Sequence, residues 1–157
     1  MVEHIFYSAP NLVSLCIDAG GSADMTGRIY HCYAKDAIPF SNATDLLLKL
    51  ERFYDWLGVP QAERQTRQFG HMHGNEGGRR MTKVKSSEEM VTPKGDLATF
   101  VVHVQYRQNA TWQGKVIWTD TKQESSFRSA LELIKLMDTA IEASAEEKDQ
   151  PKQTANG

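Results

Sequence analysis

The sequence has no hydrophobic run long enough to cross a membrane and no large excess of charge of either sign. None of its apolar stretches approaches the roughly 18–20 residues that a membrane-spanning helix needs. The first residues, MVEHIFYSAPNL, lack the basic stretch followed by an apolar stretch that is typical of a secretory signal. We therefore expect a cytoplasmic protein that does not enter a membrane.

Cysteine is also scarce. The chain of 157 residues has two, Cys16 and Cys32, without the CxxC spacing of zinc and redox motifs. Both stand among apolar residues, so we expect buried, reduced core residues. A chain of this length buries about 68–70% of its unfolded surface and can fold without disulfides or metal.

Familiar catalytic motifs are missing as well. The chain has neither the GxSxG of serine hydrolases nor the GxxxxGK[ST] of phosphate-binding loops. Glu51 and Asp55 stand four residues apart on a predicted helix, a spacing typical of a solvent-exposed face. We therefore expect a binding protein without a cofactor rather than an enzyme.

What the sequence does contain is an internal similarity. Residues 27–51 align with residues 114–138 without a gap, at a constant offset of 87. The matched pairs include Gly27 and Gly114, Phe40 and Phe127, Ala43 and Ala130, Leu46 and Leu133, and Leu50 and Met137. The alignment predicts a duplicated unit of strands followed by a helix. Amphipathic patterning that arose twice independently is the alternative explanation.

Apolar residues recur at helical spacing in both copies. The first predicted helix begins after Ser41 or Asn42, which are good capping residues, and ends at Gly58. The second covers residues 127–141 and has the same stripe. The polar residues 143–157 predict a disordered tail.

Stretches rich in β-branched and aromatic residues predict the strands. Two strands precede each helix, at residues 12–18 and 26–34 and at residues 98–108 and 112–120. Segments 4–8 and 81–91 predict a third, weaker strand before each pair.

The sequence therefore predicts an α+β domain of residues 1–142. It is a pseudo-twofold duplication of a strand-strand(-strand)-helix unit, with halves of about 1–58 and 81–142 joined by a basic loop at 59–80. The strands would form an antiparallel sheet with two helices on one face. The other face would be open to solvent or to a partner.

Alternation along the strands places basic and aromatic groups on the predicted open face. These are His103 and Arg107 in the first strand of the second half, Lys115 in the next strand, and Trp112 near the hairpin end. Such a surface suits stacking and backbone contacts with a single-stranded nucleic acid. A sheet with one solvated face and no ligand is the alternative.

Tandem units of several antiparallel strands followed by one helix resemble the Whirly and PUR-repeat proteins. The resemblance implies binding of single-stranded DNA or RNA on the sheet. Those families have four strands per unit, whereas two or three are identifiable here. None of their motifs occurs in the chain, so the resemblance assigns no site residue.

Residues 70–80, GHMHGNEGGRR, contain the candidate metal ligands His71, His73 and Glu76. A catalytic zinc needs three protein ligands and a structural zinc needs four. The other histidines are predicted in strands, so we expect no metal here. A phosphate-binding loop is not favoured either, because the glycine pair precedes a predicted strand rather than a helix.

Positive charge is concentrated in residues 63–85. Six basic residues (Arg64, Arg67, Arg79, Arg80, Lys83 and Lys85) and two acidic ones give this segment a charge of +4, in a chain of net charge −2. It could bind nucleic acid phosphates or an acidic protein surface, or it could be a solvated linker.

We expect, first, a protein that binds single-stranded nucleic acid through the open sheet face and this basic segment. The alternative is a protein-binding inhibitor, adaptor or regulator, for example from a phage or mobile element, acting through a partner interface or a homodimer.

Overall fold

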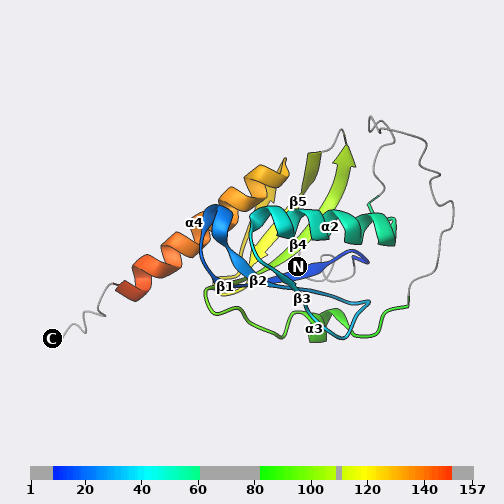
Figure 1. Cartoon of the computed structure of the whole chain (residues 1–157), viewed down its shortest axis with the longest axis horizontal. Coiled ribbons are helices and arrows are strands. Elements are labelled where there is room, and N and C mark those ends of the chain that lie inside the picture. Colours follow the sequence, from blue (N-terminus) through cyan, green and yellow to red (C-terminus); the bar gives the residue numbers. More distant parts are fainter. Residues whose placement is uncertain (1–8, 61–81, 109–110, 150–157) are drawn as a thin grey trace.

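The computed structural model describes residues 9–60, 82–108 and 111–149 (Figure 1). In this part of the chain, six antiparallel strands form one sheet with the order β3-β2-β1-β4-β5-β6. The strands are β1 (Val13–Ala19), β2 (Thr26–His31), β3 (Ile38–Phe40), β4 (Ala98–Gln108), β5 (Thr111–Trp118) and β6 (Gln123–Phe127). The predicted α+β class is confirmed.

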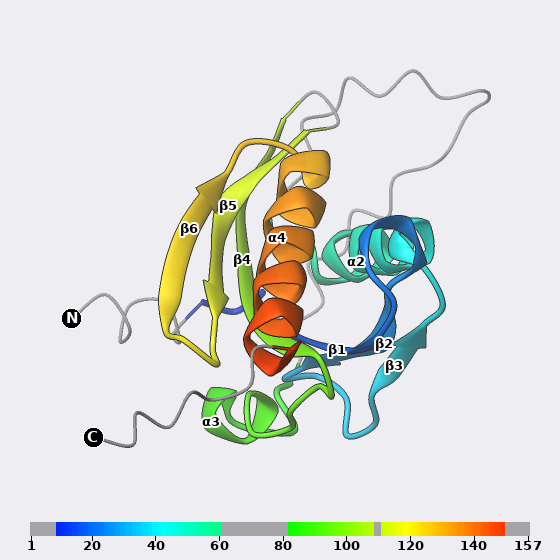
Figure 2. The same ribbon diagram turned by 90° about the vertical axis from the view of Figure 1, so that its left-hand side faces the viewer.

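Two long helices cover one face of the sheet, as predicted (Figure 2). The described residues also contain two short helices. The four helices are the 3₁₀ helix η1 (Ser22–Asp24), α2 (Ala43–Leu57), α3 (Ser87–Met90) and α4 (Ala130–Asp149). The apolar stripes of α2 and α4 are buried against the sheet, with Leu46, Leu50, Leu133 and Met137 fully covered.

Capping side chains set the start of both long helices. The Asn42 side chain accepts a 2.7 Å hydrogen bond from the amide of Asp45, and Ser129 Oγ accepts one of 3.0 Å from the amide of Glu132. Helix α2 ends at Gly58, whose positive φ of 75° suits glycine. The predicted boundaries of α2 are thus confirmed.

Helix α4 continues to Asp149, so the prediction of a disordered tail from residue 143 was wrong for residues 143–149. Ala140 and Ile141 are buried on the sheet, and the Ala- and Glu-rich sequence that follows them has high helix propensity. Residues 150–157 lie outside the described residues.

In each half a strand that was not predicted lies between the second strand and the helix. The strand predicted at 81–91 was wrong over 82–91, where Ser86 instead caps α3 by accepting a 3.1 Å bond from the amide of Glu89. The sequence missed β3 because it has three residues, and β6 because its first four residues are polar and show no alternation. The predicted strand 4–8 and residues 61–80 of the predicted joining loop lie outside the described residues.

Residues matched in the sequence alignment occupy corresponding places in the sheet. Gly27 faces Phe40 across β2 and β3, and Gly114 faces Phe127 across β5 and β6. Both glycines lie where the backbone of a central strand comes very close, Gly27 against β1 and Gly114 against β4. The origin of this correspondence by duplication stays a prediction.

Residues 82–97 cover part of the second sheet face, so the expectation of an entirely open face was wrong. The amides of Val84 and Lys85 donate to the carbonyl oxygen of Cys32, at 2.7 and 3.2 Å. A second apolar cluster lies on this face. It consists of Leu12, Cys32, Met90, Val101 and Ile117. Cys16 and Cys32 are buried, free thiols, as predicted.

Candidate functional site

Arg107 and Trp112 lie on the helix-covered face, which corrects the placement of Arg107 on the open face. The pairing of β4 with β5 is irregular between Val104 and Tyr106. One extra residue in a strand reverses the alternation of the side chains that follow it. Tyr106 is consequently exposed, and Arg107 is buried.

Arg107 joins β4 to the end of α2. Its Nη1 lies 3.1 Å from Glu51 Oε1 and 2.8 Å from Asp55 Oδ1, and its Nε and Nη2 donate to the carbonyl oxygen of Pro60 at 2.8 and 2.6 Å. Trp112 Nε1 donates to Glu51 Oε2 at 2.8 Å. The two carboxylates predicted on a merely solvent-exposed face therefore bind a buried guanidinium.

His103 and Lys115 do lie on the second face, as cross-strand neighbours. Burial lowers the pKa of His103, and the charge of Lys115 lowers it further. Lys115 is ion-paired with Glu124 at 3.4 Å. Arg107 and Trp112 lie on the opposite, helix-covered face. The four residues therefore do not form the basic and aromatic surface that was predicted on the second face.

Of the basic segment, Lys83 and Lys85 lie in the described residues. Lys83 is exposed, and Lys85 Nζ donates to the carbonyl oxygen of Lys35 at 3.1 Å and lies 5.5 Å above the Tyr30 ring. The other predicted site residues lie outside the described residues, namely Arg64, Arg67, Arg79, Arg80 and the candidate metal ligands His71, His73 and Glu76. Where the structure describes the chain, no cluster of His, Cys, Asp and Glu is arranged to hold a metal ion.

The structure instead brings together aromatic and basic residues of α2 and the end of β2. We call this feature the aromatic-basic groove; its volume is about 360 Å³. It is lined by His31, Tyr33, Ala34, Ile38, Lys49, Arg52, Phe53 and Trp56. The sequence did not predict this groove.

The rings of the groove support one another. His31 stacks on Phe53 with centroids 4.3 Å apart, and the Phe53 and Trp56 rings lie 6.3 Å apart at an angle of 29°. Tyr33 meets Trp56 edge to face at 5.9 Å. Phe53 is buried, whereas Trp56 is 51% exposed. Trp56 therefore presents an indole to solvent that buried rings hold in place.

A sequence signal existed for half of this groove. Lys49, Arg52, Phe53 and Trp56 recur at the i, i+3, i+4, i+7 spacing of one helix face. Phe53, however, belonged to the predicted core stripe, which obscured the mixed character of this face. The contribution of β2 follows only from its packing beside α2.

Three cationic side chains lie in or near the groove. Lys49 is ion-paired with Asp45 at 3.0 Å. Arg52 is exposed and, among the described residues, has no ion-pair partner. Lys85 is near enough to lower the pKa of His31 through its charge. The groove thus offers positive charge beside an exposed aromatic ring.

The two flanks of residues 61–81 are held by different contacts, the second of them beside this groove. Pro60 follows Trp56 by four residues, and Arg107 holds its carbonyl oxygen. At the other flank, Val84 and Lys85 bind the backbone of Cys32, which stands between two residues of the groove. Val84 and Lys85, at the end of the basic segment, therefore lie next to the groove.

The burial of His31 predicts a loss of stability in acid. Burial chiefly lowers its pKa to about 4, against about 6.5 in an unfolded chain. As the pH falls from about 6.5 to about 4, the unfolded chain binds the proton first, so stability is present above this window and is lost within it. We expect His31 alone to remove about 2 kcal/mol between pH 7.5 and pH 5.0.

Urea unfolding of the wild type and His31→Phe at both pH values tests this prediction. The variant keeps a ring to stack on Phe53 and should lose less stability in acid. The other histidines are present in both proteins, so the difference isolates His31. Equal losses in the two proteins would contradict the prediction.

The described fold is thus that of a small α+β protein whose most distinctive surface is the aromatic-basic groove. No protein-family model matches the chain, and no curated protein or solved structure is significantly similar to it. Among the helices that the structure describes, none is both long and apolar enough to span a membrane.

Proposed function

We propose that the protein binds single-stranded nucleic acid, with the aromatic-basic groove as the site where a base stacks. The observation that carries the proposal is the exposed indole of Trp56, backed by Phe53 and bordered by the exposed Arg52. Base stacking on an aromatic side chain contributes about 1–3 kcal/mol and tolerates any base, because every base has a π-face.

The basic segment supplies the phosphate contacts in this proposal. Residues 63–85 carry a charge of +4, and Val84 and Lys85, at the end of this segment, bind the backbone of Cys32 beside the groove. In the proposed complex, a strand whose base stacks on Trp56 meets the positive charge of Arg52. The predicted binding residues Arg79 and Arg80 belong to the same basic segment as Lys85. Binding across the whole second sheet face, as the Whirly and PUR-repeat resemblance implies, is not part of the proposal because residues 82–97 cover part of that face.

Replacing Trp56 by alanine tests the stacking step. We expect Trp56→Ala to bind a fluorescein-labelled 20-nucleotide oligo(dT) about 10- to 100-fold more weakly than the wild type, as measured by anisotropy at low salt. Tyr106→Ala is the matched control, because Tyr106 is a similarly exposed aromatic residue outside the groove. Equal weakening by the two substitutions would remove the groove from the binding site.

Salt and charge variants form the second arm of the same test. The logarithm of the association constant should fall linearly with the logarithm of the salt concentration. The slope of this line is about −0.7 multiplied by the number of phosphates that the protein neutralises. Arg52→Ala and the double variant Arg79→Ala/Arg80→Ala should reduce both the affinity and this slope. Arg128→Ala, at an exposed arginine outside the groove, should change neither. Absence of binding even at low salt would refute the proposed function.

A further inference from the structure

The two edges of the sheet differ in a way that concerns partner binding. Edge strand β3 has Pro39 at its centre, which has no amide hydrogen to donate to an added strand. Edge strand β6 contains no proline, and its residues Gln123–Ser126 are exposed. In the described part of the chain, β6 pairs on one side only, with β5. Within the described residues its other side is thus an unpaired strand edge, the kind of edge to which a further strand can add.

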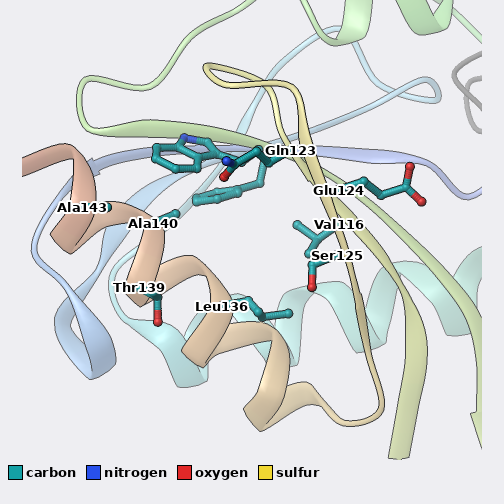
Figure 3. A pocket seen from close by; sticks show the side chains of 10 residues that line it. Val116, Gln123, Glu124, Ser125, Leu136, Thr139, Ala140 and Ala143 are labelled. Atoms are coloured by element: carbon teal, nitrogen blue, oxygen red, sulfur yellow. The ribbon is translucent and has the colours of Figure 1, made fainter.

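An apolar groove of about 530 Å³ runs between β6 and α4 (Figure 3). Phe100, Val116 and Trp118 line it from the sheet. Leu136, Ala140 and Ala143 line it from the helix, and its polar groups are those of Gln123, Ser125 and Thr139. Glu124 also lines the groove, but its carboxylate points away from it and is paired with Lys115 at 3.4 Å.

A second copy of β6 would not fill this groove. Gln123 lies opposite Trp118 and Ser125 lies opposite Val116, so the β6 side chains on the groove face are polar. The remaining one, Phe127, is already buried in its own core. The groove instead matches a strand with apolar side chains at every second position.

The negative charge of α4 favours an occupant with basic residues. Helix α4 forms one wall of the groove. Its described side chains include three acidic residues, Glu132, Asp138 and Glu142, and one basic residue, Lys135, a net charge of −2. An occupant with basic residues beyond its apolar positions would be attracted to this wall.

We propose that β6 accepts an extended peptide segment of a partner protein as an additional strand. Apolar side chains at alternate positions of the segment lie in the groove against α4, and basic residues flank them. Main-chain hydrogen bonds to β6 supply affinity, and the groove selects the side chains. This interface is separate from the aromatic-basic groove and does not depend on nucleic acid binding.

A synthetic probe tests this proposal on the full-length chain. The probe is a fluorescein-labelled peptide KKVTVTVTKK, and its binding is followed by anisotropy. Ala143→Trp fills the groove, whereas Ala145→Trp adds the same ring at an exposed position of α4 that does not line the groove. We expect wild type and Ala145→Trp to bind alike, and Ala143→Trp to bind at least about tenfold more weakly.

Two altered peptides complete the experiment and do not depend on any variant folding. Methylation of alternate backbone nitrogens should abolish binding by removing strand donors. Replacing the lysines by glutamates should weaken binding at least about tenfold at low salt. The proposal is wrong if either altered peptide binds like the probe, or if the wild type shows no saturable binding. It is also wrong if light scattering shows a wild-type dimer that Ala143→Trp converts to monomer, because a second copy would then occupy the groove.

Discussion

Replacing Gly114 by alanine is expected to destabilise the protein by about 3 kcal/mol or more, and Gly27→Ala should do the same. A Cβ atom at Gly114 would lie 2.0 Å from the carbonyl oxygen of His103, and one at Gly27 would lie 1.9 Å from the carbonyl oxygen of Cys16. The obstructing atoms belong to the backbone of the central strands, which a rotamer change cannot move. Relief therefore requires separating β5 from β4, or β2 from β1.

Gly21→Ala is the matched control for this prediction. Gly21 has an extended backbone, and the nearest atom to its Cβ would be a carboxylate oxygen of Asp138 at 3.4 Å. We expect this substitution to change the free energy of unfolding by less than about 0.5 kcal/mol. Urea unfolding of the three variants and the wild type measures these changes in the free energy of unfolding. A Gly114→Ala variant as stable as Gly21→Ala would mean that the two strands do not pack as described.

Arg107→Met is expected to cost about 3 kcal/mol of stability. The Arg107 side chain is 3% exposed and holds Glu51, Asp55 and the Pro60 carbonyl oxygen. Removing it leaves the carbonyl oxygen without these donors and the carboxylates without a counter-charge. The carboxylates are 42% and 59% exposed and can be hydrated, which keeps the cost at the lower end of the range for a broken buried pair.

Arg28→Met provides the comparison on the surface. Arg28 binds Asp18 with contacts of 3.0 and 3.1 Å, but its side chain is 34% exposed. An exposed pair of this kind contributes up to about 1 kcal/mol. Thermal or urea unfolding should therefore rank Arg107→Met well below Arg28→Met in stability. The reverse order would show that Arg107 does not bridge α2 and β4 in solution.

The alternation of side chains along β4 could be predicted from the sequence only as far as the strand is regular. The strand is regular up to Val104, so Val102 and Val104 alternate with His103 and point into the core. One irregularity after Val104 then put Arg107 on the opposite face from the one predicted. Glu51 and Asp55 are complementary to this arginine, but a distant ion pair leaves no local pattern in the sequence.

The aromatic-basic groove shows a second limit. The helical spacing of Lys49, Arg52, Phe53 and Trp56 was visible in the sequence, but the same periodicity also describes a core stripe. Tyr33 and His31 join these residues because the end of β2 packs beside α2. Contacts between elements distant in sequence therefore decide whether the stripe is core or site.

The sequence alone determined the α+β class, two of the three strands in each described half, the bounds of α2 and the apolar stripe of α4. These features depend on local periodicity and caps, such as Asn42 before α2 and the apolar stripes of both helices. The predicted range of α4, 127–141, differs at both ends from the observed 130–149. Only the tertiary structure decided that residues 82–97 cover part of the second face and that β6 is an edge beside an apolar groove. Which face of the sheet is covered and which strand is an edge depend on contacts between segments that are distant in the sequence. These contacts form because they bury apolar surface, and a local sequence pattern does not reveal which segments will meet.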